Sequence, residues 1–276
     1  MKEIIVISGS PRKNGDTSKI THLFEERMKH HGNINFNYIY LKNKNLNFCR
    51  GCLLCMKKGE NSCPIKDDAI DLRNELLEAD GVIFVTPVYI HSTSALMKNF
   101  LDRFAYFMHR PAFHNKPALL ITSTEISGTK ETIHYMKFPI KAWGFSYLGD
   151  ISIIVDAFKL EGKFRNSILN SIDIKAKKFV KKLDSSQIEK PSLSSLQFFN
   201  MLKTKVILHR KNLPYDYEYW KIKGWLDSCY FYPASINPIK KLFGKTKIQF
   251  IKFVMRIKLG KELYRKIFTE PMLDQV

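Results

Sequence analysis

Near its start the chain reads Ile4-Ile5-Val6-Ile7-Ser8-Gly9-Ser10-Pro11-Arg12-Lys13-Asn14-Gly15-Asp16-Thr17-Ser18, an apolar run that passes through a glycine into a polar loop. The run is too short for a membrane span and lacks a cleavage-site pattern, so it predicts a buried first strand and a cytoplasmic protein. A helical pattern follows over residues 17–29. The order strand, glycine turn, helix predicts an α/β protein with a ligand loop at its first turn.

The same alternation continues through the first two-thirds of the chain. Further apolar strands are expected at 35–41, 81–86, 117–123 and 148–155, and further helices at 67–78, 94–108, 131–143 and 163–183, with Pro139 bending or breaking one of them. Five strands interleaved with five helices predict a flavodoxin-like, doubly wound parallel sheet of order 2-1-3-4-5. A six-stranded dinucleotide-binding fold is the main alternative, but its G-x-G-x-x-G turn is missing.

The composition sets limits on the rest of the chain. The 276 residues carry a net charge of +19, which favours acidic partners such as phosphorylated cofactors or simply reflects solvated lysine faces. We expect a domain over residues 1–185 and a basic, aromatic, mainly helical extension over 186–276. The basic stretch 240–259 fits an anionic membrane surface or packing against protein, and we favour packing. No known nucleic-acid module is visible, so we expect no nucleic-acid partner.

The loop after the first strand has the chemistry of a phosphate site. Gly9 and Gly15 permit a tight turn with inward N–H groups, and the following helix directs its positive end at a bound anion. Charge-assisted or hydroxyl contacts are expected from Ser10, Arg12, Asn14, Thr17 and Ser18. The alternative is an ordinary turn in which Asp16 or Thr17 caps the helix. The loop is not a nucleotide triphosphate loop, because no Gly-Lys-Ser/Thr ends it.

A second loop follows the third strand, at the switch point where open α/β sheets bind ligands. Its residues are Pro87, Val88, Tyr89, Ile90, His91 and Ser92. Tyr89 offers an aromatic face, and the N–H groups that follow can bond the polar edge of a flat ring. Taken alone, Tyr89 fits a packing role equally well, and His91 fits a surface loop.

These two loops, together with the run Ser94-x-x-x-Lys98-x-Phe100-x-Asp102-Arg103, resemble the NADPH-dependent FMN reductase family, and within it the iron–sulfur flavoprotein group. The resemblance covers residues 1–185. It implies that the first loop binds the FMN phosphate, that the second holds the isoalloxazine ring, and that the protein is a homodimer or homotetramer. One departure is the loop after the fourth strand, 123–128, which has a single glycine where the family often has several.

A compact cysteine loop lies at 49–63, with the ligand candidates Cys49, Cys52, Cys55 and Cys63. The spacing C-x2-C-x2-C-x7-C favours a [4Fe–4S] cluster, since three close thiolates can bind three irons and the fourth the last. Zinc, and thiols without metal, are the alternatives. The resemblance implies a cluster here as well. Cys229, far along the chain, is expected to be a buried thiol.

The expected activity is electron transfer through FMN, from NADH, NADPH or a ferredoxin-like donor to an acceptor, with no catalytic acid or base assigned. Two other functions remain open. One is an electron-carrier flavoprotein without nicotinamide chemistry, and the other is a quinone or nitroaromatic reductase that lacks the cluster.

Overall fold

The computed structural model describes residues 1–156 and 163–240. The chain divides into two compact units. The first consists of Met1–Arg50, Ile65–Ala105 and Ala112–Gln187, and the second of Gly51–Pro64, Tyr106–Pro111 and Ile188–Val276. The domains that the sequence suggests, 1–185 and 186–276, stay a prediction.

The first unit is built on a five-stranded, all-parallel sheet, which confirms the predicted fold class. Its order is β2-β1-β3-β4-β5. The strands are β1 (Lys2–Ser8), β2 (Ile34–Tyr40), β3 (Gly81–Pro87), β4 (Pro117–Thr124) and β5 (Ser146–Ile154). Every residue of β3 and β4 is buried, as expected for central strands covered on both faces.

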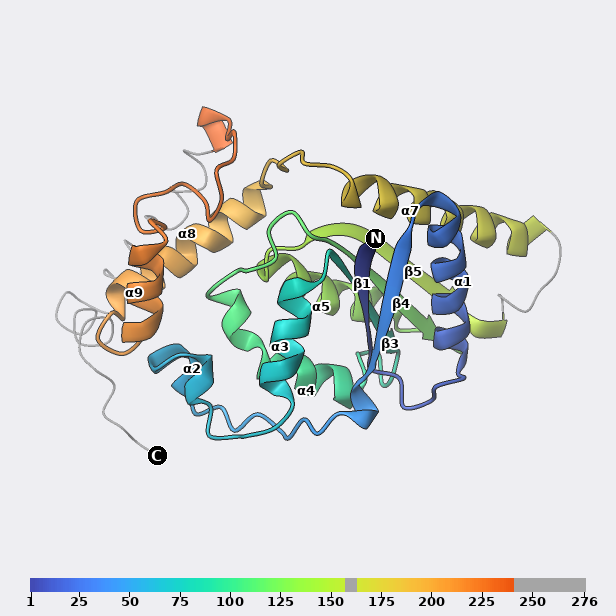
Figure 1. Ribbon diagram of the computed structural model, residues 1–276, viewed down its shortest axis with the longest axis horizontal. Helices are drawn as coiled ribbons and strands as arrows, with labels where there is room; N and C mark the ends of the chain where they lie inside the picture. Colours follow the sequence, from blue (N-terminus) through green and yellow to red (C-terminus); the bar gives the residue numbers. More distant parts are fainter. Residues whose placement is uncertain (157–162, 241–276) are drawn as a thin grey trace. The chain divides into compact units, whose positions relative to one another are not determined.

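Helices cover the two faces of this sheet (Figure 1). They are α1 (Asp16–His31), α3 (Ala69–Glu78), α4 (Ala95–Arg103), α5 (Thr129–Ala142) and α7 (Lys163–Leu183). Helices α1 and α7 pack against each other on one face, and Figure 1 shows α3, α4 and α5 on the opposite one. Because the strands are parallel, the loops after β1, β3 and β4 all emerge at the same edge of the sheet.

Apolar side chains fill both layers between sheet and helices. Under α1 and α7, the ring of Phe179 meets that of Phe24 edge to face at 6.3 Å, and a Cβ on Gly81 would lie only 3.1 Å from Phe179. On the other face, Trp143 lies 5.9 Å from Phe100 between ring centroids. The side chains of both layers are buried, so the sheet edge that carries the loops rests on packed cores.

Two helices differ from the sequence expectation. The predicted helix 94–108 ends at Arg103, and a separate 3-10 turn, Ala105–Met108, continues the chain. Helix α5 runs through Pro139 to Ala142 without breaking. Pro139 lies in the last turn and removes only its own N–H donor, while its carbonyl accepts from the Trp143 N–H at 2.8 Å.

The described part of the second unit is helical, as predicted for the extension. It contains α2 (Leu54–Lys57), a 3-10 turn at Glu60–Ser62, α8 (Leu193–Leu208) and α9 (Pro214–Ile222). Its buried core is strongly aromatic and comprises Leu196, Phe199, Leu202, Val206, Trp220, Trp225 and Tyr230. Helices α2 and α9 contact each other, so the cysteine loop and the C-terminal segment belong to one packed body.

No helix within residues 1–156 and 163–240 is long and apolar enough to cross a bilayer. Of the basic stretch 240–259, residues 241–259 lie outside the described residues.

Candidate functional site

The loop after β1 is held against the end of β3. The Gly9 N–H donates to the Val85 carbonyl at 2.8 Å. A Cβ at Gly9 would lie 2.8 Å from both Met97 Cβ and Ser94 Oγ, on the first turn of α4. Such an approach is closer than packed carbon atoms allow, so this position requires glycine.

Hydroxyl groups line the inside of this loop. Ser10, Thr17 and Ser18 are buried, whereas Arg12 and Asn14 are exposed. The Ser10 hydroxyl accepts from the Arg12 N–H at 3.2 Å and donates to its carbonyl at 3.0 Å, and Ser18 donates to the same carbonyl at 3.4 Å. The structure thus brings Ser10, Arg12 and Ser18 together and leaves the Asn14 side chain toward solvent.

The N-terminus of α1 lacks a side-chain cap. Gly15 occupies the N-cap position, and no side chain bonds to the first N–H groups. An ordinary turn capped by Asp16 or Thr17 is therefore not what the loop forms. Instead, the Thr17 hydroxyl lies 2.5 Å from that of Ser123 at the end of β4. Uncapped N–H groups and buried hydroxyls at a helix N-terminus are the donors that a phosphate dianion needs.

The loop after β3 is a tight turn. The N–H of Tyr89 bonds to the Ser92 carbonyl at 2.9 Å, and the Ser92 N–H bonds back at 3.0 Å. Ile90 and His91 between them have φ of 48° and 56°, in the left-handed region that β-branched residues avoid. The side chain of Ile90 is 97% exposed, and Tyr89 is also exposed. The turn therefore presents an aromatic ring and an isoleucine outward in a strained backbone.

Ser94 joins the two loops. Its hydroxyl accepts from the Met97 N–H at 3.2 Å, which caps α4, and donates to the Gly9 carbonyl at 2.7 Å. Its N–H bonds to the Thr86 hydroxyl at 3.1 Å. Ser94 is not among the predicted site residues, although a serine directly before a helical pattern is a recognised N-cap signal.

The loop after β4 supports the turn from the other side. The Val88 N–H donates to the Ser123 carbonyl at 2.9 Å, and His91 Nε2 lies 3.1 Å from the Ser127 hydroxyl. Gly128 has φ of 94°, and a Cβ there would lie 2.9 Å from His91 Cα. The single glycine of this loop is thus the one that its contact with the turn requires.

The arms of the cysteine loop are tied to α4. Arg103 forms a two-pronged ion pair with Asp67, with Nη1–Oδ2 at 2.5 Å and Nη2–Oδ1 at 2.9 Å, and donates to the Asn47 carbonyl at 2.8 Å. The side chains of Arg103 and Asp67 are only 2% and 0% exposed. Asn99 donates to the Leu46 carbonyl at 2.8 Å. These contacts span 36 to 56 positions in sequence, which is why periodicity could not predict them.

The Asp67 carboxylate is poised to stay ionised. Burial alone raises its pKa, but hydrogen bonds from Arg103 and from the N–H groups of Asn47 and Ala69 outweigh burial and lower the pKa below 3.8. The charged form is therefore the one that the fold selects.

The four predicted ligand cysteines lie on either side of a boundary between compact units. Cys49 belongs to the first unit, and Cys52, Cys55 and Cys63 belong to the second. Gly51 and Leu53 have φ of 66° and 58°, which curves the loop sharply. The cysteines form no disulfide with one another. Four thiols suit iron–sulfur chemistry as donors, but in the described part of the chain no three potential ligands gather closely enough to hold a metal.

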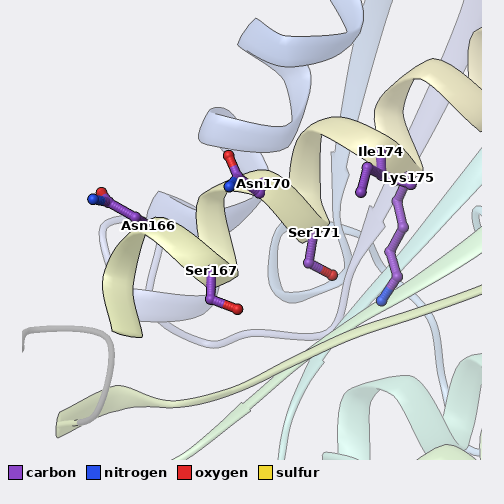
Figure 2. A pocket seen from close by; sticks show the side chains of 6 residues that line it. All are labelled: Asn166, Ser167, Asn170, Ser171, Ile174 and Lys175. Carbon is purple, nitrogen blue, oxygen red and sulfur yellow. The ribbon is translucent and has the colours of Figure 1, made fainter. Parts of the chain in front are cut away.

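A separate open depression lies on α7, lined by Asn166, Ser167, Asn170, Ser171, Ile174 and Lys175 (Figure 2). It shares no residue with the loops after β1, β3 and β4.

Sequence comparison places these features among known proteins. The model of the family "NADPH-dependent FMN reductase" matches residues 2–159. An iron–sulfur flavoprotein of Clostridioides difficile is 32% identical over 210 residues, 74% of this chain and 88% of that protein. One of Archaeoglobus fulgidus is 29% identical over 221 residues, 80% of this chain and 98% of that protein.

Structural comparison supports the fold. The structure of an oxidoreductase from Corynebacterium diphtheriae superposes with a TM-score of 0.52 at 14% identity, covering 66% of this chain and 97% of that one.

The contribution of the buried ion pair between Arg103 and Asp67 to the stability of the fold should depend on pH. Asp67→Asn should lower the free energy of unfolding at pH 7 by about 3–5 kcal/mol, because Arg103 is left buried without its charge partner. Since the folded-state pKa of Asp67 is lowered, its stabilisation is full above pH 3.8 and is lost as the pH falls through the folded value. The difference between wild type and variant should therefore shrink below that pH.

Urea unfolding from pH 7 to 3 measures this difference. Asp102→Asn is the matched control, because Asp102 pairs with Lys98 on the exposed side of the same helix. The control should change stability by less than about 1 kcal/mol. Equal effects of the two substitutions would show that the buried pair contributes no special stability.

Proposed function

We propose that this chain, which belongs to the NADPH-dependent FMN reductase family, binds FMN at the loops after β1 and β3. The bound FMN would transfer electrons from NAD(P)H or a reduced carrier to an acceptor. The observation that carries the proposal is the uncapped N-terminus of α1 beside buried hydroxyls. A phosphate monoester supplies the acceptors that the uncapped N–H groups lack.

The phosphate would be held by the loop after β1. The first N–H groups of α1 would donate to it, and the buried hydroxyls of Ser10, Thr17 and Ser18 lie beside them. Because each hydroxyl has a single hydrogen, its donation to the phosphate would replace a bond to the Arg12 carbonyl or, where Thr17 is the donor, to Ser123. Arg12 and Asn14 lie exposed at the rim, where they could close over the phosphate from outside.

The ring would lie against the turn after β3, over residues Pro87, Val88, Tyr89, Ile90, His91 and Ser92. When bound, FMN accepts two electrons as hydride and can release them one at a time. The chain's own part is to orient the ring through backbone donors and to limit access to it with Tyr89. Ser94 keeps this turn in register with the phosphate loop by bonding to Gly9. No side chain is assigned to proton transfer.

The proposal extends to a [4Fe–4S] cluster bound by Cys49, Cys52, Cys55 and Cys63. It is supported by the spacing of these cysteines and by the names of the relatives as iron–sulfur flavoproteins. The curved backbone at Gly51 and Leu53 suits a compact loop of ligands.

Removal of one phosphate donor tests the cofactor site. Thr17→Val keeps the shape of the side chain but removes its hydroxyl, and a hydrogen bond to a charged group is worth about 1.5–3 kcal/mol. FMN affinity should fall about tenfold to a hundredfold. Riboflavin, which lacks the phosphate, should bind wild type and variant equally, and titration of flavin fluorescence measures both. Equal weakening for both flavins would indicate a damaged loop rather than a lost phosphate contact.

The electron donor is tested by anaerobic mixing. NADPH or NADH added to the FMN-loaded chain should bleach the flavin absorption in a stopped-flow experiment, because a reductase accepts hydride directly. Reduced ferredoxin serves as the comparison donor. Bleaching by ferredoxin alone would exclude nicotinamide chemistry and leave an electron-carrier function.

Metal analysis of anaerobically purified protein tests the cluster. We expect about four irons and four sulfides per chain. Cys55→Ser should lose most of this iron, whereas Cys229→Ser, the matched control, should retain it. Wild-type protein that binds FMN but contains neither iron nor sulfide would make the chain a flavin reductase without a cluster.

A further inference from the structure

Arg110 occupies a buried site in the second unit that the proposed function does not use. Its side chain is 4% exposed and contacts three acceptors. Nη1 bonds to Asp216 Oδ1, and Nη2 lies 2.9 Å from Glu60 Oε2 and 3.0 Å from the carbonyl of Cys55. One guanidinium thus connects helix α9 to the backbone of a proposed cluster ligand.

Helix α9 contacts both this arginine and the residue before it, His109. Asp216 is fully buried and uses both oxygens, since Oδ2 lies 2.7 Å from His109 Nδ1 while Oδ1 binds Arg110. One turn further along the helix, Trp220 Nε1 donates to the His109 carbonyl at 2.7 Å. Arg110 is therefore held from the side of α9 as well as by the cysteine loop.

Aromatic rings exclude water from the contact. The rings of Tyr215, Tyr106 and Tyr219 lie 5.0, 5.3 and 5.8 Å from Arg110 Cζ. Gly59 has φ of 90°, and a Cβ there would lie 2.8 Å from the Tyr215 ring. The cysteine loop and α9 are therefore complementary in shape, and the shielded hydrogen bonds are stronger than exposed ones.

We propose that Arg110 and Asp216 are positioning residues for Cys55, through which α9 holds the backbone of the cysteine loop in place. The inference rests on the proposed function in taking Cys55 as a ligand. It assigns a role to the segment 188–240, which lies outside the family match of 2–159.

Two variants remove the contact by different routes. Asp216→Asn takes away the carboxylate that orients Arg110. Arg110→Lys keeps the charge but lacks the planar fork needed to bond Asp216 and Cys55 together. Glu218→Gln is the matched control, because Glu218 lies on the same helix in an exposed pair with Lys221, 3.8 Å away.

Amide hydrogen exchange of the full chain reads out the loop directly. The N–H groups of Met56, Lys57 and Lys58 bond to the carbonyls of Leu53 and Leu54. Their exchange should be about tenfold faster or more in both variants and unchanged in Glu218→Gln. Exchange in α1 and the affinity for FMN should not change. Unchanged exchange at these three amides, or equal acceleration in α1, would overturn the inference.

Retention of iron provides the functional readout. In anaerobically purified protein, Arg110→Lys should lose iron to a chelator about tenfold faster than wild type or Glu218→Gln. Equal rates in all three proteins would overturn the role of Arg110. Wild-type protein without iron would overturn the proposed cluster instead, while the exchange measurement still decides whether α9 holds the loop.

Discussion

The hydrogen bond from the Ser94 hydroxyl to the Gly9 carbonyl holds the candidate cofactor site together. Ser94 belongs to the loop after β3 and Gly9 to the loop after β1, and these strands are neighbours in the sheet. The same hydroxyl caps α4, so the start of that helix, the phosphate loop and the exposed turn share one fixed point. The bond can be this short only because Gly9 has no side chain.

Helix α4 connects the phosphate loop to the segment before the cysteine loop. At its N-terminus it is tied to the phosphate loop through Ser94, and toward its C-terminus Asn99 and Arg103 bind the carbonyls of the segment that leads to Cys49. A nine-residue helix of about 1.5 Å rise per residue thus connects the phosphate loop to the segment that precedes Cys49, both within the first unit. In the second unit, Arg110 provides a corresponding attachment for Cys55. Each part of the cysteine loop is therefore anchored by a buried arginine.

The sequence predicted the sheet and the loops because these depend on local patterns. Apolar runs and helical periods determine strand order once right-handed crossovers are assumed, and the glycine and hydroxyl content of residues 9–18 indicates phosphate chemistry. The buried ion pairs of Arg103 and Arg110 could not be predicted in this way, since their partners are distant in sequence. The C-terminal segment appeared only as basic and aromatic, and nothing in its periodicity indicates that α9 contacts α2.

The left-handed turn at Ile90 and His91 stores backbone strain in the candidate site. An L-residue in that conformation loses about 1–2 kcal/mol relative to the right-handed form, and two such residues stand in succession. A ligand that prefers another arrangement of this turn recovers that energy on binding. Such a ligand needs a smaller difference in affinity between the two arrangements of the turn than it would need if the turn were unstrained. The strain in these two residues therefore lowers the energetic cost of rearranging the turn.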